Sequence, residues 1–193
     1  MTDRQAGDPD PGARDEGTTT LGRWQTHQVS NQVDERVDYD LYATDAALGE
    51  ALERAAADAD RATLAEQGRQ LGRAECFALA ARANAHEPEL DMFDARGRRV
   101  DHVAFSGAWH ALLAGLRADG AVTLPFEDRR PGRWSAWAAC FYLHGQVEAG
   151  TLCPATMTQA SIPVLRREPT LWPALASRLL HRGHDPSDRP IEQ

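Results

Sequence analysis

His144 and Glu148, two side chains that could begin a metal site, lie four residues apart. On a helix this spacing places both on one face, and imidazole and carboxylate groups are common metal ligands. The sequence offers no identifiable third ligand, and the His-Glu-x-x-His arrangement of metalloproteases is absent. We therefore predict no metal site and interpret His144 and Glu148 as a satisfied polar pair beside a helical core.

Cys153 precedes Pro154, a residue that suits the first turn of a helix. Backbone N–H groups at a helix start can lower the pKa of a thiol. A cysteine nucleophile also needs a base, and His144 lies nine residues earlier with no assured shared face. We assign no catalytic residue and expect Cys153 to be a buried or half-buried residue at a helix start.

Arg96, Arg98 and Arg99 cluster at a predicted turn. A phosphate contact is one interpretation, but no aromatic or glycine-rich cradle accompanies them, which favours a solvated turn. Gly-x-Gly-x-x-Gly, Walker-type and Gly-x-Ser-x-Gly motifs do not occur. We therefore assign no cofactor-binding residue.

The composition, with 42% hydrophobic and 26% charged residues over 193 positions, is that of one globular domain. No apolar run approaches the length of a membrane helix, and the acidic N-terminus argues against a secretory signal. The three cysteines are widely spaced without a Cys-x-x-Cys pair, so we expect free thiols. The expected compartment is the cytoplasm, with no membrane partner.

The net charge of −8 and the pI of about 5.3 argue against nucleic-acid binding by this chain. Non-specific DNA affinity comes from lysine and arginine side chains that neutralise phosphates. The basic clusters of this sequence are small. We expect no direct DNA binding.

Changes in amino-acid composition along the chain predict four regions. Residues 1–20 are acidic and rich in Gly and Pro, so we expect a disordered tail. Residues 21–43 lack a helical period and contain Trp24 and Tyr42; an extended arm anchored by these rings is favoured over an ordinary disordered lead-in. Residues 44–182 form the helical domain, and 183–193 form a frayed tail.

Apolar residues recur at helical spacing through 44–182, which predicts an all-α bundle of about six helices. Thr44 is the predicted N-cap of the first helix, the second helix runs from about Thr63 to Ala85, and Ser106 caps the next. The most apolar helix, from about Arg133 to Leu152, should be buried nearly all round. One short hairpin is expected near residues 90–103, around a type I turn.

Several segments, in order between Trp24 and Leu180, carry a resemblance to a known family. They are Trp24–His27, Asn31–Gln32, Gln70–Glu75, Asp94–Arg99, Ala108–His110 and, most specifically, His144–Thr158. Together they resemble the N-terminal helical domain of the AidB-type acyl-CoA dehydrogenases, flavoproteins linked to the adaptive response to DNA alkylation.

The resemblance implies FAD, a tetramer, and a chain that ends where such a protein enters its flavin-binding β-domain. Because that domain and the flavin-contacting C-terminal segments have no counterpart here, no catalytic or flavin residue carries over, and this chain alone is not expected to hold FAD. The family layout points to Cys153, Met157 and Thr158 as the residues that face the substrate or flavin cleft. The expected partners are copies of the chain or the missing remainder of the flavoprotein.

The sequence therefore leaves two hypotheses for the function. The first is the N-terminal domain of an AidB-like, flavin-dependent acyl-CoA dehydrogenase relative, with an implied role in the DNA alkylation response and no activity as a fragment. The second is a free-standing helical interaction or oligomerisation module without flavin. A helical hydrolase that uses Cys153 or His144 is disfavoured by the missing base.

Overall fold

A computed structural model describes residues 30–57 and 60–189. The chain divides into two units, residues 1–35 and residues 36–193. Of the first unit only residues 30–35 are described; they form neither helix nor strand, and Val33 is 94% exposed. The predicted acidic tail and the predicted anchor Trp24 lie outside the described residues.

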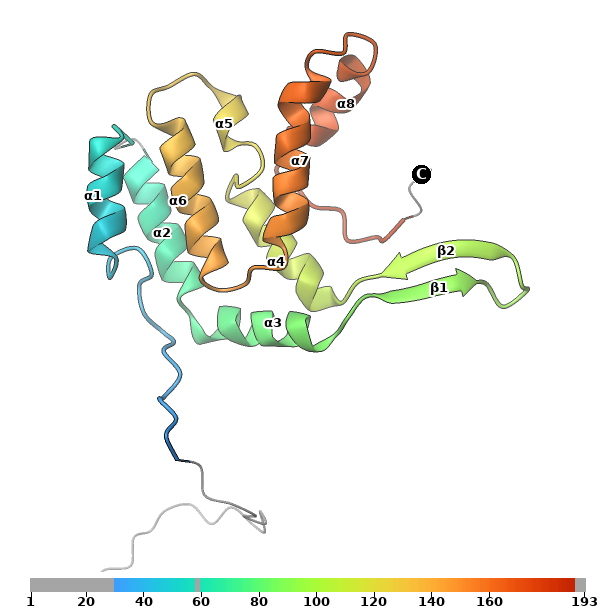
Figure 1. Cartoon of the computed structure of the whole chain (residues 1–193), viewed down its shortest axis with the longest axis horizontal. Coiled ribbons are helices and arrows are strands. Elements are labelled where there is room, and N and C mark those ends of the chain that lie inside the picture. Colours follow the sequence, from blue (N-terminus) through green and yellow to red (C-terminus); the bar gives the residue numbers. More distant parts are fainter. Residues whose placement is uncertain (1–29, 58–59, 190–193) are drawn as a thin grey trace, which may run out of the picture. The chain divides into compact units, whose positions relative to one another are not determined.

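Eight helices and one two-stranded sheet make up the described part of the second unit (Figure 1). The helices are α1 (Ala46–Arg54), α2 (Arg61–Leu71), α3 (Ala74–Ala85), α4 (Gly107–Ala118), α5 (Leu124–Glu127), α6 (Arg133–Gly145), α7 (Leu152–Leu165) and α8 (Trp172–Leu179). The strands are β1 (Glu89–Phe93) and β2 (Arg99–Ala104). The predicted fold, a helical bundle with one short hairpin, is confirmed. None of these helices is long and apolar enough to cross a membrane.

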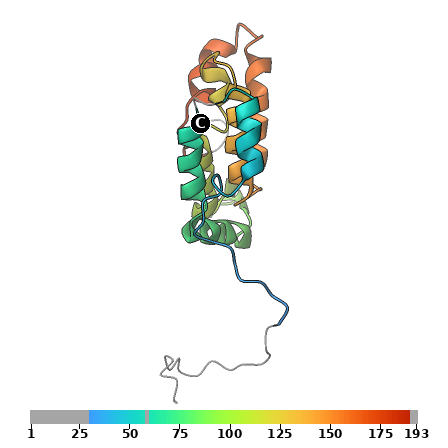
Figure 2. The ribbon, with the colours of Figure 1, turned by 90° about the vertical axis from the view of Figure 1, so that its left-hand side faces the viewer.

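Helix α6 lies within the bundle and contacts α1, α2, α5 and α7. Its buried side chains recur every three or four residues, and they are Ala136, Ala139, Cys140, Leu143 and His144. Trp134 and Tyr142, however, are 49% and 48% exposed. The prediction that this helix is buried nearly all round is wrong for the described chain, because α1, α2, α5 and α7 leave one side of it open. Figure 2 shows α1 and α2 on the side away from α7.

Trp137 and Phe141 lie at the edge of the core rather than in its centre. Both are half-buried and pack against the core cluster. The indole N–H of Trp137 donates a hydrogen bond to the Ala121 carbonyl at 2.6 Å. The centre is occupied by smaller aliphatic side chains such as Leu116 and Leu143, which are fully buried.

The single helix predicted from Thr63 to Ala85 is in fact two helices, because the chain turns sharply after α2. An extended segment lies against this turn: the N–H of Tyr39 donates to the Gly72 carbonyl at 3.3 Å, and the N–H of Leu41 donates to the Gly68 carbonyl at 3.2 Å. A Cβ atom at Gly72 would lie 1.7 Å from the Tyr39 carbonyl oxygen. The two glycines therefore allow the extended segment to approach the helix backbone closely.

Helix α3 begins anew at this turn. Its first N–H, that of Ala74, donates to the Asp38 carboxylate at 2.9 Å. The new start rotates the buried face, so Ala80 is buried while Ala78 and Ala81 are exposed. The buried face of α3 therefore does not continue that of α2.

Side-chain caps fix the starts of α1 and α4. Asp45, rather than the predicted Thr44, caps α1 by accepting from the Leu48 N–H at 2.9 Å. Ser106 caps α4 as predicted, accepting from the Trp109 N–H at 3.2 Å. Both caps satisfy a backbone donor that the helix itself leaves unpaired.

The hairpin has the predicted turn. The Gly97 N–H donates to the Asp94 carbonyl at 2.9 Å, and Gly97 has a φ of 76°, which glycine adopts without strain. The strands pair antiparallel, with an irregularity between Asp91 and Phe93. Leu90 and Phe93 are 58% and 57% exposed, so the hairpin presents apolar side chains to its surroundings.

Pro163 lies inside α7, which continues to Leu165. The short helix α5 precedes the loop that leads into α6. The C-terminal part differs from the prediction in its last described segment. Residues 183–189, within the tail expected to be frayed, contact α4: the Arg117 guanidinium donates to the Gly183 carbonyl at 2.9 Å.

Candidate functional site

Glu148 organises the connection between α6 and α7. Its carboxylate accepts from the Thr151 N–H and the Thr151 hydroxyl, both at 2.8 Å, and from the Gly150 N–H. Burial alone would raise the pKa of Glu148, but these hydrogen bonds outweigh burial and hold that pKa below its usual value. The charged carboxylate thereby sets the geometry in which α7 starts.

His144 does not pair with Glu148. Its Nε2 lies 2.8 Å from the Asp119 carboxylate at the end of α4, and the Asp119 carbonyl accepts from the Gln67 side chain at 3.3 Å. Both His144 and Glu148 are buried polar groups with partners. Helix α6 ends at Gly145, however, so Glu148 lies beyond it and does not share a helix face with His144. Among the described residues no group of three or more His, Cys, Asp or Glu side chains is arranged to hold a metal.

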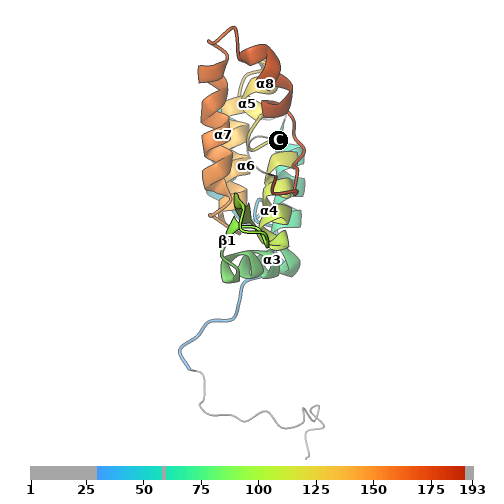
Figure 3. The same cartoon turned by 90° about the vertical axis from the view of Figure 1, so that its right-hand side faces the viewer.

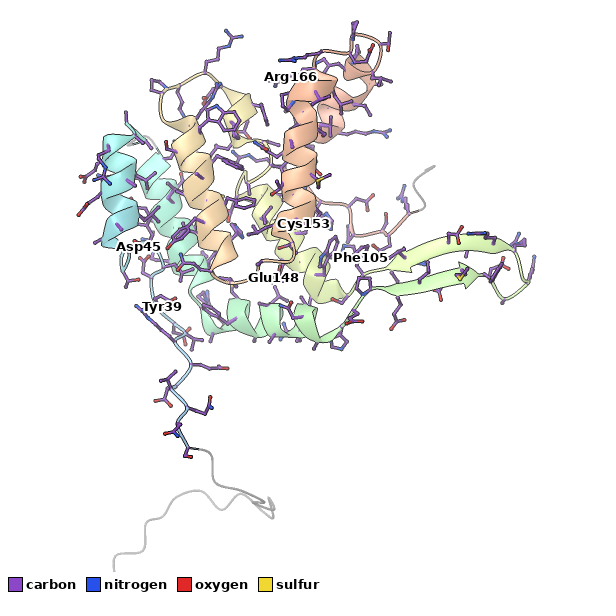
Figure 4. The ribbon with its side chains drawn as sticks, viewed as in Figure 1. Tyr39, Asp45, Phe105, Glu148, Cys153 and Arg166 are labelled. Atoms are coloured by element: carbon purple, nitrogen blue, oxygen red, sulfur yellow. The ribbon has the colours of Figure 1, made fainter. Side chains whose placement is uncertain are left out.

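The three residues that the sequence placed at a substrate or flavin cleft lie in the first two turns of α7. Cys153 is exposed and Met157 is 69% exposed. Thr158 is half-buried, and its hydroxyl donates to the Pro154 carbonyl at 3.0 Å. Figure 4 shows Cys153 at the start of α7, close to Glu148. The prediction that Cys153 is buried or half-buried is wrong.

Cys153 and Met157 continue into a longer uncharged surface. Spacings of four, three and four residues align Cys153, Met157, Ala160 and Val164 on one side of α7, and all four are exposed. We call these four residues the α7 face. Helix α7 has no charged residue between Leu152 and Leu165. Figure 3 shows α7 at the front of the bundle with α6 behind it.

The α7 face is a helix surface and not an enclosure. Four hollows found on the described residues are lined by other side chains, and none includes Cys153, Met157 or Thr158. A flavin needs contacts around its ring and its pyrophosphate. The residues present would supply one wall of such a site.

The described cysteines offer little support for nucleophilic catalysis. Burial raises the pKa of the Cys140 thiol to about 12, and burial also raises the pKa of Cys76. Cys153 is exposed, whereas His144, the base considered from the sequence, is buried. Among the described residues no hydrogen bond joins the Cys153 thiol to His144, as nucleophilic catalysis by this pair would require.

Two small arginine clusters of the sequence lie on different elements. Arg98 and Arg99 pair with Asp94 and Asp101 on the hairpin, at 2.6 and 2.7 Å. Arg129, Arg130 and Arg133 belong to the loop before α6 and its first residue, and Figure 1 shows this end of the bundle well apart from the hairpin. These arginines therefore do not form one basic face.

A polar cluster that the sequence did not reveal joins α4 to the C-terminal segment. His110 Nδ1 lies 2.9 Å from His184 Nε2, and His110 Nε2 lies 3.0 Å from the Asp188 carboxylate. Asp188 also accepts from the Phe105 N–H at 3.0 Å. These residues are more than 70 positions apart in sequence and follow no motif, so only the folded chain brings them together.

Comparison with known proteins agrees with this architecture. The sequence matches the family described as the adaptive response protein AidB N-terminal domain over residues 31–186. It is 48% identical over 143 residues, or 74% of this chain, to AidB of Escherichia coli (strain K12), a protein named as an acyl-CoA dehydrogenase.

Two solved structures share the fold. One is ACDH-11 of Caenorhabditis elegans in complex with C11-CoA, with a TM-score of 0.67 and 23% identity over 88% of this chain. The other is Bd2924 in its apo form, with a TM-score of 0.69 and 25% identity over 78% of this chain.

The chain spans only part of each relative. It covers 26% of the length of E. coli AidB and 31% of each solved structure. Since the family match includes more than three quarters of the chain and the identity to AidB is close to one half, the chain belongs to the AidB N-terminal domain family.

Proposed function

We propose that this chain is the helical N-terminal part of an AidB-like, flavin-dependent acyl-CoA dehydrogenase relative. The observation that carries the proposal is the α7 face, an exposed helix surface without a single charge. An isolated soluble surface normally carries charges at such positions. The face fits a role as one wall of a cleft completed by another domain.

In this proposal Cys153 and Met157 face the acyl chain or the flavin, and Thr158 lies at the edge of the wall. Small and apolar side chains suit an acyl group, because burial of both surfaces removes apolar area from water. FAD, when bound in such a protein, supplies the acceptor for the electrons removed from the substrate. Glu148 and Thr151 position this wall through the cap that starts α7.

The flavin itself would be held by parts of the protein beyond this chain. None of the four hollows on the described residues includes the α7 face, and the sequence contains no glycine-rich phosphate loop. The isolated chain is thus expected to be inactive. The relationship to AidB supports a cytoplasmic role in the DNA alkylation response and an oligomeric assembly.

The experiment is to purify the 193-residue chain, record its flavin absorbance, and then add FAD and an acyl-CoA. The expected result is a folded chain without flavin and without reduction of added flavin by the acyl-CoA. Stoichiometric flavin that an acyl-CoA reduces would contradict the proposal that the remainder of the protein is required.

A second candidate, a free-standing interaction module, is favoured by one observation: the apolar side chains of the hairpin are exposed. A lone two-stranded hairpin is only marginally stable in water, so it gains from a partner. The two candidates differ in the DNA that follows this reading frame. A continuing or adjacent frame that encodes a flavin-binding β-domain favours the dehydrogenase.

A further inference from the structure

A hollow of about 720 Å³ lies between α5, the start of α6 and the end of α7. It is lined by Pro125, Phe126, Glu127, Asp128, Arg129, Arg133, Trp134 and Arg166. Its volume falls within the range of small-molecule sites. It shares no residue with the α7 face.

The charge of this hollow is positive although the chain as a whole is acidic. Glu127 is paired with Arg182 at 2.7 Å, and Asp128 accepts from the Arg130 N–H at 3.0 Å and lies 3.4 Å from its Nε. Arg129 and Arg133 form no ion pair or side-chain hydrogen bond with any described residue. The acidic side chains of the lining are thus already engaged, while the guanidinium groups of Arg129 and Arg133 have no partner within residues 30–57 and 60–189.

Arg133 places a positive charge where it destabilises helix α6. It is the first residue of α6, where the helix dipole favours anions and disfavours cations. The first turn holds no acidic residue, and Gly132 before it provides no capping side chain. Departures from local helix preference gather at functional sites. An anionic ligand would convert this unfavourable charge into a favourable one.

Arg166 is held in place by two aromatic rings. Its guanidinium lies 5.1 Å from the Phe126 ring centroid and 5.3 Å from that of Trp172, and it donates to the Phe126 carbonyl at 3.4 Å. Figure 4 shows Arg166 at the end of α7. An arginine fixed by stacking loses little further entropy when it binds a phosphate.

Trp134 adds an aromatic surface to the same hollow. Its ring packs edge-on against Phe126, with centroids 5.8 Å apart, and it remains 49% exposed. A tryptophan that is fixed by an edge-on aromatic contact and still exposes part of its indole ring can stack on a planar ring of a ligand. The hollow therefore combines three guanidinium groups with one accessible indole.

We propose that this hollow binds a nucleoside diphosphate, with Arg129, Arg133 and Arg166 on the phosphates and Trp134 on the base. Guanidinium groups form paired, charge-assisted hydrogen bonds with phosphate oxygens. Three of them match the charge of a diphosphate, whereas a single phosphate would leave one unpaired. The stacked base supplies the part of the affinity that an inorganic anion lacks.

The test is a titration of the full chain with ADP, inorganic pyrophosphate, adenosine and a thymidine oligonucleotide, followed by tryptophan fluorescence and calorimetry. ADP should bind more tightly than pyrophosphate or adenosine and should quench the fluorescence of Trp134. Arg129→Gln and Arg133→Gln should each weaken ADP binding about tenfold, as the loss of a charge-assisted hydrogen bond does. Trp134→Leu should weaken ADP binding and leave pyrophosphate binding unchanged.

Arg96→Gln is the matched control, because Arg96 is an exposed arginine on the hairpin turn, apart from the hollow. It should leave ADP binding unchanged, and circular dichroism of every variant should match the parent chain. An absence of ADP binding, an equal loss in Arg96→Gln, or equal affinities for ADP and pyrophosphate would each overturn the proposal. Tighter binding of the oligonucleotide with the same arginine dependence would reassign the hollow to single-stranded nucleic acid.

Discussion

At the scale of single residues, Glu148 shows how one carboxylate can set the start of a functional helix. It accepts two hydrogen bonds from Thr151 and one from Gly150 while it is only 8% exposed. Glu148→Gln replaces an acceptor with an amide that points one N–H₂ group at these donors. We expect a loss of about 1–3 kcal/mol in the free energy of unfolding, measured by urea denaturation. Glu87→Gln, at an exposed glutamate, is the control and should change nothing.

The Glu148 carboxylate also makes the stability of the fold depend on pH. The pKa of Glu148 in the folded chain lies below the ordinary value of 4.5. The ionised carboxylate therefore contributes its full stabilisation of the fold above pH 4.5, and this stabilisation is lost as the pH falls through the folded pKa. The unfolding midpoint of the parent chain should therefore fall on acidification below about pH 4.5 more steeply than that of Glu148→Gln. Parallel pH profiles for the two proteins would show that the cap contributes nothing.

His184 gives a second, separate pH dependence near neutrality. Burial, followed by the neighbouring His110 and Arg117, lowers the pKa of His184 below 6.5. A lowered histidine pKa contributes stability above the unfolded value, and that stability is lost as the pH falls from there through the folded pKa. The protection factors for amide hydrogen exchange in residues 183–189, which compare each rate with the intrinsic rate at the same pH, should thus fall on acidification below pH 6.5. His184→Gln should remove this fall in protection; its persistence in that variant would exclude His184 as the cause.

At the scale of elements, the break between α2 and α3 depends on Gly72. Its substitution by Ala places a Cβ against the Tyr39 carbonyl, which forces backbone movement and should cost about 2–3 kcal/mol. Gly115→Ala is a matched control within α4, where a Cβ meets no atom within 4 Å and the better helix propensity should add about 0.5–1 kcal/mol. Thermal unfolding of both variants checks the pair. An unchanged midpoint for Gly72→Ala would mean that the segment around Tyr39 does not lie on this turn.

The elements also show what sequence pattern can and cannot provide. The hairpin turn and the Ser106 cap follow local rules and were predictable from their residues alone. The break after Leu71 was not, because its cause is a tertiary contact with Tyr39. The exposed side of α6 was missed for a related reason: an apolar helix has the same sequence whether or not a neighbour covers each face.

At the scale of the whole molecule, the candidate site also combines features that the sequence indicated with features that only the folded chain reveals. The family resemblance named Cys153 and Met157 together, and both lie on α7, although the exposure of Cys153 was not foreseen. The clusters around His110 and Arg166 join residues that are distant in sequence, so no local pattern could reveal them. That the α7 face borders a flavin cleft stays a prediction.

The distribution of charge over the molecule leads to a further prediction, that this chain does not bind duplex DNA tightly. The net charge is −8, and the arginines of the hairpin and of the α6 start do not share one face. Non-specific binders reach Kd values of about 10⁻⁴–10⁻⁶ M at physiological salt, and this chain should bind more weakly. Micromolar affinity with a steep salt dependence in a mobility-shift titration would contradict this.

The central claim, that this chain is the N-terminal wall of an AidB-like flavoprotein, is tested most directly by the flavin content of a chimera. The N-terminal quarter of E. coli AidB would be replaced by this chain, and flavin absorbance would be measured beside E. coli AidB and a chimera with Met157→Arg. The account predicts stoichiometric flavin in the chimera and its loss in Met157→Arg, with an Ala81→Arg control on the exposed side of α3 retaining it. A folded chimera without flavin, or full flavin in the Met157→Arg chimera, would contradict the account.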